Sequence, residues 1–266
     1  MNISGQRILI TGATGGIGRK LTMALVEKGA ELVLAGTDVN KLVQLKRAVL
    51  VRGGKAHIFT CDLAAPDAPL VLSDQVIGAT GGVDILVNCA GIASFGLFDQ
   101  QTPESIEALW RINVLAPMQL TRALLPQMIA SRHGRIVNVG STFGSIGFAY
   151  FTTYSASKFA MRGFSEALRR ELEGSGVGVT YVAPRYTKTP LNDGAVSRMA
   201  QVVGMNSDEP SLVARHVVRA IEKSSNDYYI GWPESLFVRI NAVLPRLVDF
   251  ALRKQNDKTR PFAVQE

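Results

Sequence analysis

Short runs of β-branched and aliphatic residues alternate along the chain with longer segments in which apolar residues recur at the helical period. The short runs predict seven strands, and the longer segments predict the helices between them. Parallel strands need helical crossovers, so this alternation indicates an α/β protein with a doubly wound, parallel, seven-stranded sheet and helices on both faces. The predicted strands are Arg7–Thr11, Glu31–Ala35, Ala56–Cys61, Asp84–Asn88, Arg135–Val139, Val177–Val182 and Tyr228–Gly231, and the predicted helices are Ile17–Lys28, Asn40–Arg52, Ala68–Ala79, Pro103–Met128, Ser155–Leu172 and Ser211–Ser224.

Two segments stand outside this alternation. Residues 184–210 show no strong period, and a loop of that length is typically a lid or a binding element. No repeat, low-complexity tract or Pro/Ser-rich linker divides the chain, so residues 1–235 are predicted to form one domain. Residues 236–266 are predicted to add an amphipathic helix and a basic tail, and the tail from Lys254 to Glu266 is expected to be flexible.

The stretch Leu236–Leu252 separates apolar and basic residues on different sides of a helix, which Pro245 would bend. It has two uses. The more frequent is packing on the domain, over a substrate pocket, or on a neighbouring subunit, and we expect a homodimer or homotetramer. The other is contact with an anionic membrane surface through residues 236–253. The apolar stripe is Leu236, Ile240, Val243, Leu244, Leu247 and Ala251, and the basic stripe is Arg239, Arg246 and Arg253.

The composition, with 47% hydrophobic and 19% charged residues, is that of a globular protein. The two cysteines, Cys61 and Cys89, indicate reduced thiols in the cytoplasm rather than a secreted disulfide framework. We expect no secretory signal and no spanning helix, which leaves the inner membrane surface as the one membrane contact to consider. The net charge of +7 is compatible with an anionic partner, but no basic patch interleaved with aromatic residues predicts nucleic-acid binding.

The first predicted strand runs into a glycine-rich turn, Thr11-Gly12-Ala13-Thr14-Gly15-Gly16-Ile17-Gly18, and then into a helix. Glycines allow a tight turn and a close approach of the backbone to a pyrophosphate, whose charge the helix N-terminus stabilises. A glycine-rich turn alone is weak evidence. Its place after the first strand of an α/β alternation predicts a Rossmann-type dinucleotide site.

A second set of polar residues predicts acid–base chemistry. Tyr154 and Lys158 lie four residues apart, on one face of a helix, and the ammonium is expected to lower the tyrosine pKa from about 10 by about 1–3 units. Taken alone, such a pair is more often an ordinary surface pair. Ser141 follows a predicted strand and would face the crevice at the carboxyl edge of the sheet. Asn113 interrupts an apolar helix, either as a functional residue or as a kink.

Together these motifs resemble those of the short-chain dehydrogenase/reductase family. The resemblance extends over residues 5–231 and rests on the Thr-Gly-x-x-x-Gly-x-Gly turn, Asp62-Leu63, Asn88-Cys89-Ala90-Gly91, and Ser141 thirteen residues before the Tyr-x-x-x-Lys pair. It implies an NAD(P)-dependent oxidoreductase that transfers hydride between a nicotinamide cofactor and a carbonyl or secondary alcohol, without a metal. The cofactor contacts that it implies are Thr11, Gly12, Thr14, Gly15, Gly16, Ile17, Gly18, Gly36, Thr37, Asp38, Asp62, Leu63, Asn88, Ala90, Gly91, Tyr154, Lys158, Pro184, Thr187 and Thr189.

The resemblance also implies a catalytic role for four residues. Tyr154 exchanges a proton with the substrate oxygen, and Ser141 hydrogen-bonds that oxygen as negative charge develops. Lys158 lowers the tyrosine pKa and binds the nicotinamide ribose, while the backbone carbonyl of Asn113 holds a water of the proton relay. The alternatives are a non-catalytic redox sensor that binds dinucleotide, which would not need these four residues, and a lipid ketone reductase on the membrane surface.

Cofactor choice depends on the end of the second predicted strand. An acidic residue there binds the adenosine ribose of NAD, and a basic residue pairs with the 2′-phosphate of NADP. This chain has Gly36 and Thr37, so both signals are missing, and Asp38 serves equally well as a ribose ligand or as the cap of the next helix. The small pair leaves room for a phosphate near Arg19 and Lys20, which favours NADP.

The segment Pro184-Arg185-Tyr186-Thr187-Lys188-Thr189 resembles the Pro-Gly element of the family, with Arg185 in place of glycine. If the family backbone requires a conformation that only glycine tolerates, Arg185 reshapes the loop. We expect its side chain to be solvated, in preference to a contact with an acidic substrate.

The walls of the substrate pocket are expected from residues 92–98, 143–151 and 189–205. Their aromatic and methionine side chains favour a bulky apolar substrate, although the same side chains would equally serve core or subunit packing. They are Phe95, Phe98, Phe143, Phe148, Tyr150, Phe151, Met199 and Met205.

Overall fold

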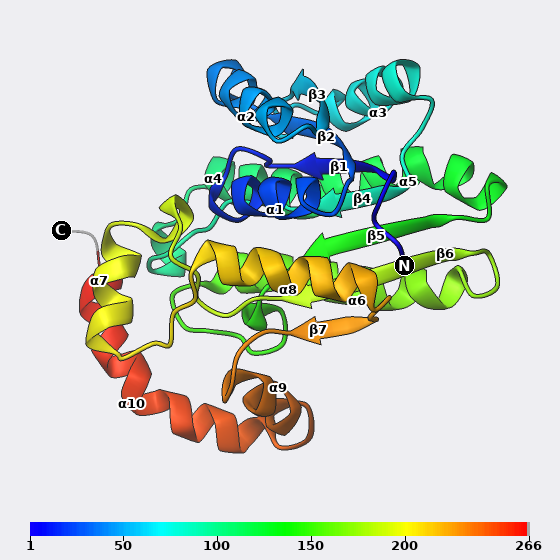
Figure 1. The fold of residues 1–266 in the computed structure, drawn as a ribbon. Coiled ribbons are helices and arrows are strands. Elements are labelled where there is room, and N and C mark those ends of the chain that lie inside the picture. The colour runs from blue at the N-terminus through cyan, green and yellow to red at the C-terminus, as the bar shows by residue number, and fades with distance from the viewer. Residues whose placement is uncertain (265–266) are drawn as a thin grey trace.

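The strands form one parallel sheet at the centre of the molecule (Figure 1). The computed structural model describes residues 1–264. The strand order is β3-β2-β1-β4-β5-β6-β7, which confirms the predicted seven-stranded doubly wound sheet and places a crevice at the carboxyl edge, where the order reverses between β1 and β4. The strands are β1 (Arg7–Thr11), β2 (Glu31–Gly36), β3 (Lys55–Thr60), β4 (Ile85–Asn88), β5 (Gly134–Val139), β6 (Val177–Ala183) and β7 (Asp227–Tyr229).

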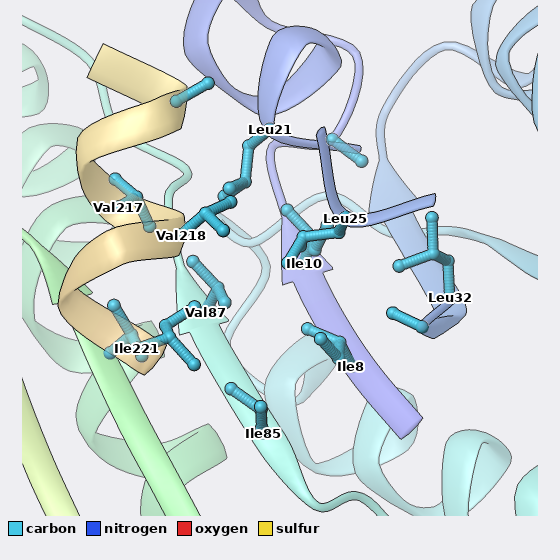
Figure 2. Packing of buried hydrophobic residues seen from close by; sticks show 14 of the residues in the cluster. Ile8, Ile10, Leu21, Leu25, Leu32, Ile85, Val87, Val217, Val218 and Ile221 are labelled. Carbon is cyan, nitrogen blue, oxygen red and sulfur yellow. The ribbon is translucent and has the colours of Figure 1, made fainter. Parts of the chain in front are cut away.

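Alternate side chains of the strands supply two hydrophobic cores, one on each face of the sheet. In β1, Ile8 and Ile10 belong to the core under α1, α2 and α8, whereas Leu9 belongs to the core under α3, α5 and α6. Figure 2 shows Leu25 of α1 and Val218 of α8 above the strands of the first core. These helices are α1 (Gly16–Val26), α2 (Val39–Val51), α3 (Ala68–Thr80), α5 (Ala116–Ala130), α6 (Thr152–Glu171) and α8 (Pro210–Glu222).

The single helix predicted for residues 103–128 is divided by a π-helical turn. The α4 helix (Pro103–Trp110) is capped by Thr102, whose side chain accepts a hydrogen bond from the backbone N–H of Ser105. The π turn η2 (Arg111–Leu115) follows, and α5 continues the helix. Such turns are frequent at functional sites, and this one contains Asn113.

The segment predicted to be a loop, residues 184–210, contains two short helical elements. They are the 3-10 turn η4 (Pro190–Asn192) and the helix α7 (Ala195–Val202). Val196 and Met199 of α7 are buried in a third hydrophobic cluster, together with Phe148 and Phe151. The α7 helix is too short for a strong period in the sequence, but its buried face holds the segment against the domain.

The C-terminal segment forms two helices, α9 (Glu234–Val243) and α10 (Pro245–Ala263), separated at Leu244. Proline lacks the N–H that would continue α9, so the bend predicted at Pro245 is confirmed. The flexible tail predicted from Lys254 is wrong for residues 254–263, because α10 continues there and buries Thr259 and Ala263. The prediction for residues 265–266 lies outside the described residues.

The helices α7 and α10 lie side by side beyond the carboxyl ends of the strands (Figure 1), and α9 contacts both α10 and residues 142–144. None of the helices within residues 1–264 has the length and apolar character needed to cross a membrane.

Candidate active site

The glycine-rich turn after β1 is packed so closely that Gly12 and Gly18 have no room for a side chain. Gly12 has a φ of +64°, and a Cβ there would lie 2.7 Å from the Cα of Ala90. A Cβ on Gly18 would lie 2.2 Å from the carbonyl oxygen of Gly12. The turn leads directly into the N-terminus of α1, so this backbone fits the pyrophosphate of a dinucleotide.

Thr11 and Asn88 stabilise the segments after β1 and β4 through hydrogen bonds. The Thr11 hydroxyl accepts hydrogen bonds from the backbone N–H groups of Cys89, at 3.1 Å, and Ala90, at 3.2 Å. The buried Asn88 side chain donates to Oδ1 of Asn138 at 2.8 Å. This side chain therefore joins β4 to β5, and a contact of Asn88 with the cofactor stays a prediction.

The acidic group after β2 caps a helix. Oδ1 of Asp38 accepts a hydrogen bond from the backbone N–H of Lys41 at 3.0 Å, and its other oxygen lies 3.3 Å from the Lys41 ammonium. The backbone hydrogen bond is the main reason that the pKa of Asp38 is lowered. The capping role, one of the two considered for Asp38, is thus confirmed. The two residues before it, Gly36 and Thr37, carry no carboxylate that could bind a ribose.

Tyr154, Lys158 and Ser141 come together from α6 and the end of β5. The Lys158 ammonium lies 5.5 Å from the centroid of the Tyr154 ring and donates to the carbonyl oxygen of Val139 at 3.4 Å. The Ser141 hydroxyl accepts from the backbone N–H of Phe143 at 3.1 Å, which orients it at the start of the short turn η3 (Thr142–Gly144).

Burial shifts the pKa values of both Tyr154 and Lys158. It raises the pKa of Tyr154 to about 12, while a hydrogen bond with Ser141 opposes the rise. It lowers the pKa of Lys158 to about 8, against the effect of the nearby Cys89 thiol. The tyrosine pKa is therefore raised, not lowered as predicted, because desolvation by burial outweighs the hydrogen bond with Ser141. At neutral pH the phenol retains its proton, as an acid toward a carbonyl oxygen requires.

Asn113 connects the π turn to both neighbouring segments. Its side-chain amide exchanges two hydrogen bonds with the backbone of Ile92, both at 2.9 Å, and donates to the hydroxyl of Ser157 at 3.1 Å. A Cβ on Gly91 would lie 3.2 Å from Oδ1 of Asn113 and 3.6 Å from the Lys158 ammonium. The absence of a side chain at Gly91 thus keeps the approach to Lys158 and Asn113 open.

A pocket of about 70 Å³ brings the chemical residues and the cofactor turn to one place. Its lining includes Ile17 from the glycine-rich turn, Ser141 and Tyr154, and the segment after β6. Thr189 belongs to that segment and packs on Gly16, where a Cβ would lie 2.5 Å from Thr189 Cγ2. Pro184 and Thr187 also line this pocket, whereas Asp62, Leu63 and Thr37 lie outside its lining.

The Arg185 side chain is not solvated, which corrects the prediction. Its guanidinium makes two hydrogen bonds to Asp208, at 3.0 and 2.8 Å, and one to Glu234 at 2.9 Å. The Asp208 side chain is only 3% exposed, so it requires this cation. Arg185 is absent from the residues with positive φ, so its backbone needs no glycine. The side chain is fully engaged in joining the segment after β6 to α9.

A larger cavity of about 410 Å³ adjoins the pocket and shares five lining residues with it, namely Thr142, Phe143, Arg185, Tyr186 and Met205. Of the predicted substrate walls, Phe143, Phe148 and Met205 line the cavity, whereas Phe98 is 57% exposed and lies outside both spaces. Phe151 and Met199 line the smaller pocket, and with Phe95 they also pack in the third cluster.

Sequence reasoning did not assign any residue of α9 or α10 to the substrate walls. Eight line the cavity, and they are Glu234, Phe237, Ile240, Leu247, Val248, Ala251, Leu252 and Gln255. The apolar stripe through Ile240, Leu247 and Ala251 was the available signal, since packing over the pocket was one of its predicted uses.

The chain matches known proteins along most of its length. The family model described as short chain dehydrogenase matches residues 6–200. The ketoacyl reductase HetN of Nostoc sp. is 33% identical over 86% of this chain and 79% of its own length, and the dehydrogenase/reductase SDR family member 7B of Bos taurus is 33% identical over 90% and 78%. The structure of a metagenomic short-chain oxidoreductase in complex with NADP is 32% identical, with a TM-score of 0.73 over 86% of this chain and 97% of that one.

Proposed function

The chain belongs to the short-chain dehydrogenase/reductase family and is an NAD(P)-dependent oxidoreductase, and on this premise we propose that it interconverts a carbonyl and a secondary alcohol on an apolar substrate, with Tyr154 as the acid–base group. The observation that carries the proposal is the pocket in which Tyr154 and Ser141 face the turn that fits a dinucleotide. A nicotinamide cofactor bound there supplies or accepts the hydride.

Each polar residue has a distinct task in this proposal. In carbonyl reduction Tyr154 donates its phenolic proton to the substrate oxygen, and Ser141 donates a hydrogen bond to the same oxygen as negative charge develops there. Lys158 holds positive charge beside the phenol and binds the ribose next to the reacting ring. Asn113 is a positioning residue whose hydrogen bonds to Ile92 and Ser157 fix the route by which protons return to Tyr154. Oxidation follows the same path in reverse.

The cofactor is held by the turn from Thr11 to Gly18, and we favour NADP over NAD. The capping role of Asp38 supports this choice, because its carboxylate is already hydrogen-bonded to Lys41 and is a poorer ribose acceptor. The Lys41 ammonium, together with the exposed Arg19 and Lys20, offers positive charge for a 2′-phosphate. The remaining predicted contacts, at Asp62, Leu63, Asn88, Ala90, Gly91, Pro184, Thr187 and Thr189, belong to the same proposal.

The substrate is a small molecule, and we propose that its body is apolar. The 410 Å³ cavity next to Tyr154 is lined mainly by aliphatic and aromatic side chains, including Phe143, Phe237 and Leu252. Its volume lies within the range of sites for drug-sized ligands. Assembly into a homodimer or homotetramer and peripheral membrane contact through residues 236–253 remain predictions.

A turnover screen tests the proposed function. The protein is incubated with NADPH or NADH and a panel of apolar and polar ketones, and cofactor absorbance is followed. We expect turnover of apolar ketones and faster rates with NADPH. Bound cofactor without turnover of any ketone or alcohol would instead support a redox sensor.

A further inference from the structure

The outer face of α9 and α10 carries large apolar side chains that are exposed. Val243 at the end of α9 is 77% exposed, and Phe250 on α10 is 69% exposed. On the opposite side of α10, Val248 and Thr259 are buried against the domain. Soluble proteins rarely expose contiguous apolar patches of this kind unless they bind something. The exposed apolar residues that define this outer face are Leu236, Phe237, Val243, Leu244, Leu247 and Phe250.

The charge of α9 and α10 indicates which kind of partner would bind this outer face. Residues 239–260 contain six Lys/Arg and only two Asp/Glu, so most of the net charge of +7 is concentrated here. The six basic side chains are all exposed, and the Arg253 guanidinium lies 5.9 Å from the centroid of the Phe250 ring. Basic groups beside apolar ones are typical of a helix that lies in the interface of an anionic bilayer. A symmetric contact between two copies would instead bring the two positive faces together.

The outer face also contains the rim of the substrate cavity. Phe237 and Leu247 are both exposed at the surface and part of the cavity lining. From this rim the cavity extends to Phe143 and Met205, which also line the pocket that contains Tyr154. An apolar route therefore leads from the outer face of α9 and α10 to the catalytic phenol.

We propose that the outer face of α9 and α10 docks on an anionic lipid bilayer, and that apolar substrates pass between the bilayer and Tyr154 through the rim at Phe237 and Leu247. Docking itself needs only the surface, whereas the substrate route rests on the proposed function. A substrate that enters in this way crosses no water, so the cost of exposing its apolar chain to water is avoided at each turnover.

Docking is tested by sedimentation of the full chain with vesicles of phosphatidylcholine, with and without phosphatidylserine. We expect pelleting with the anionic vesicles that weakens as salt is added. Neutralising basic residues in Arg246→Gln and Lys254→Gln is expected to weaken binding about fivefold each. Phe250→Ser is expected to weaken it too. The matched controls are Arg47→Gln and Val51→Ser, two exposed positions on α2 at the far end of the sheet, and neither should change binding.

Equal pelleting of the α10 variants and the controls would overturn the docking proposal. A dimer in solution that Phe250→Ser converts to a monomer, together with an absence of vesicle binding, would overturn it in favour of a second copy as the occupant. Phe250, Arg246 and Lys254 are exposed and lie outside the cavity lining, so their substitution should not unfold the protein. A difference in pelleting between these variants and the controls therefore reports vesicle binding.

The substrate route is tested with two ketones, a long-chain methyl ketone dissolved in anionic vesicles and a short water-soluble ketone. We expect Phe250→Ser to lower turnover of the vesicle-dissolved ketone several-fold and to leave turnover of the short ketone unchanged. An equal effect on both would overturn the route. If the parent protein turns over neither ketone, the proposed function and the route both fail, and sedimentation still decides the docking.

Discussion

Arg185 and Asp208 form a bidentate ion pair, with hydrogen bonds of 3.0 Å from Nε and 2.8 Å from Nη2. The same guanidinium donates to Glu234 at the start of α9. This one side chain therefore joins three segments, namely the loop after β6, the approach to α8, and the C-terminal helices over the cavity.

Removing the Arg185 guanidinium is expected to lower the free energy of unfolding. Arg185→Ala leaves the buried Asp208 carboxylate unpaired and should lower the free energy of unfolding by about 3 kcal/mol, measured by urea denaturation. Arg185→Lys should recover little, because an ammonium does not reproduce the two parallel hydrogen bonds. The control is Arg170→Ala, which breaks an exposed pair with Glu166 and should cost less than about 1 kcal/mol. Equal costs at the two positions would contradict the account of Arg185.

The buried Lys158 ammonium should make stability depend on pH. Its pKa falls from 10.5 to about 8 on folding, so above pH 8 the unfolded chain binds more protons than the folded one, and the free energy of unfolding rises with pH. Between about pH 8 and 9 we expect a rise of about 1 kcal/mol in the cofactor-free protein. Above that range Cys89 and Tyr154, whose pKa values are raised, act in the opposite direction.

The variant Lys158→Met isolates this contribution. Its unfolding free energy, from urea titrations in the same buffers, should lose the rise between about pH 8 and 9. A rise that persists in this variant would show that another group titrates there.

The turn after β1 offers a direct test of the cofactor site. Gly12→Ala adds a Cβ that would lie 2.7 Å from the Ala90 backbone, at a φ of +64°, so it should displace the turn and weaken NADPH binding by about tenfold or more in a fluorescence titration. The matched control is Gly53→Ala, where φ is +73° and no atom lies within 4 Å of the added Cβ. It should cost about 1 kcal/mol of stability and leave binding unchanged. If the two variants bind NADPH equally, the pyrophosphate site lies elsewhere.

Cofactor choice is expected to change at Gly36. Gly36→Asp places a carboxylate where it accepts hydrogen bonds from the adenosine ribose and repels a 2′-phosphate, so the ratio of kcat/KM values should shift toward NADH by about tenfold or more. Gly36→Ala adds the Cβ without the charge and controls for its contact with Thr14. An unchanged ratio in Gly36→Asp would place the recognition of the 2′ position on other residues.

The sheet was predictable because each strand is a short apolar run and each crossover helix has a regular period. In β1 the residues Ile8, Leu9 and Ile10 are all buried, since both faces of the strand are covered, and this gives the run its continuous apolar character. The position of Ser141 followed from the same order, because residues at the carboxyl ends of parallel strands share one edge. Tyr154 and Lys158 were placed on one face of a helix by their spacing of four residues.

What the sequence did not predict depends on contacts between distant segments. The partners of Arg185 lie 23 and 49 residues away, and no local pattern indicates that those carboxylates will surround it. The helix after Lys254 has a polar composition, and its order comes from Thr259 and Ala263, which are buried against the domain. The raised pKa of Tyr154 likewise has its cause in burial, which spacing along α6 does not report.

The variant Tyr154→Phe tests the central claim most directly, because it removes only the phenolic oxygen from an otherwise unchanged ring. The measurement pairs kcat for the best apolar ketone with the Kd of NADPH from a fluorescence titration. Loss of the proton donor should lower kcat by about a hundredfold or more, and the Kd should not change. A variant that keeps the parent kcat would contradict the assignment of Tyr154 as the acid–base group.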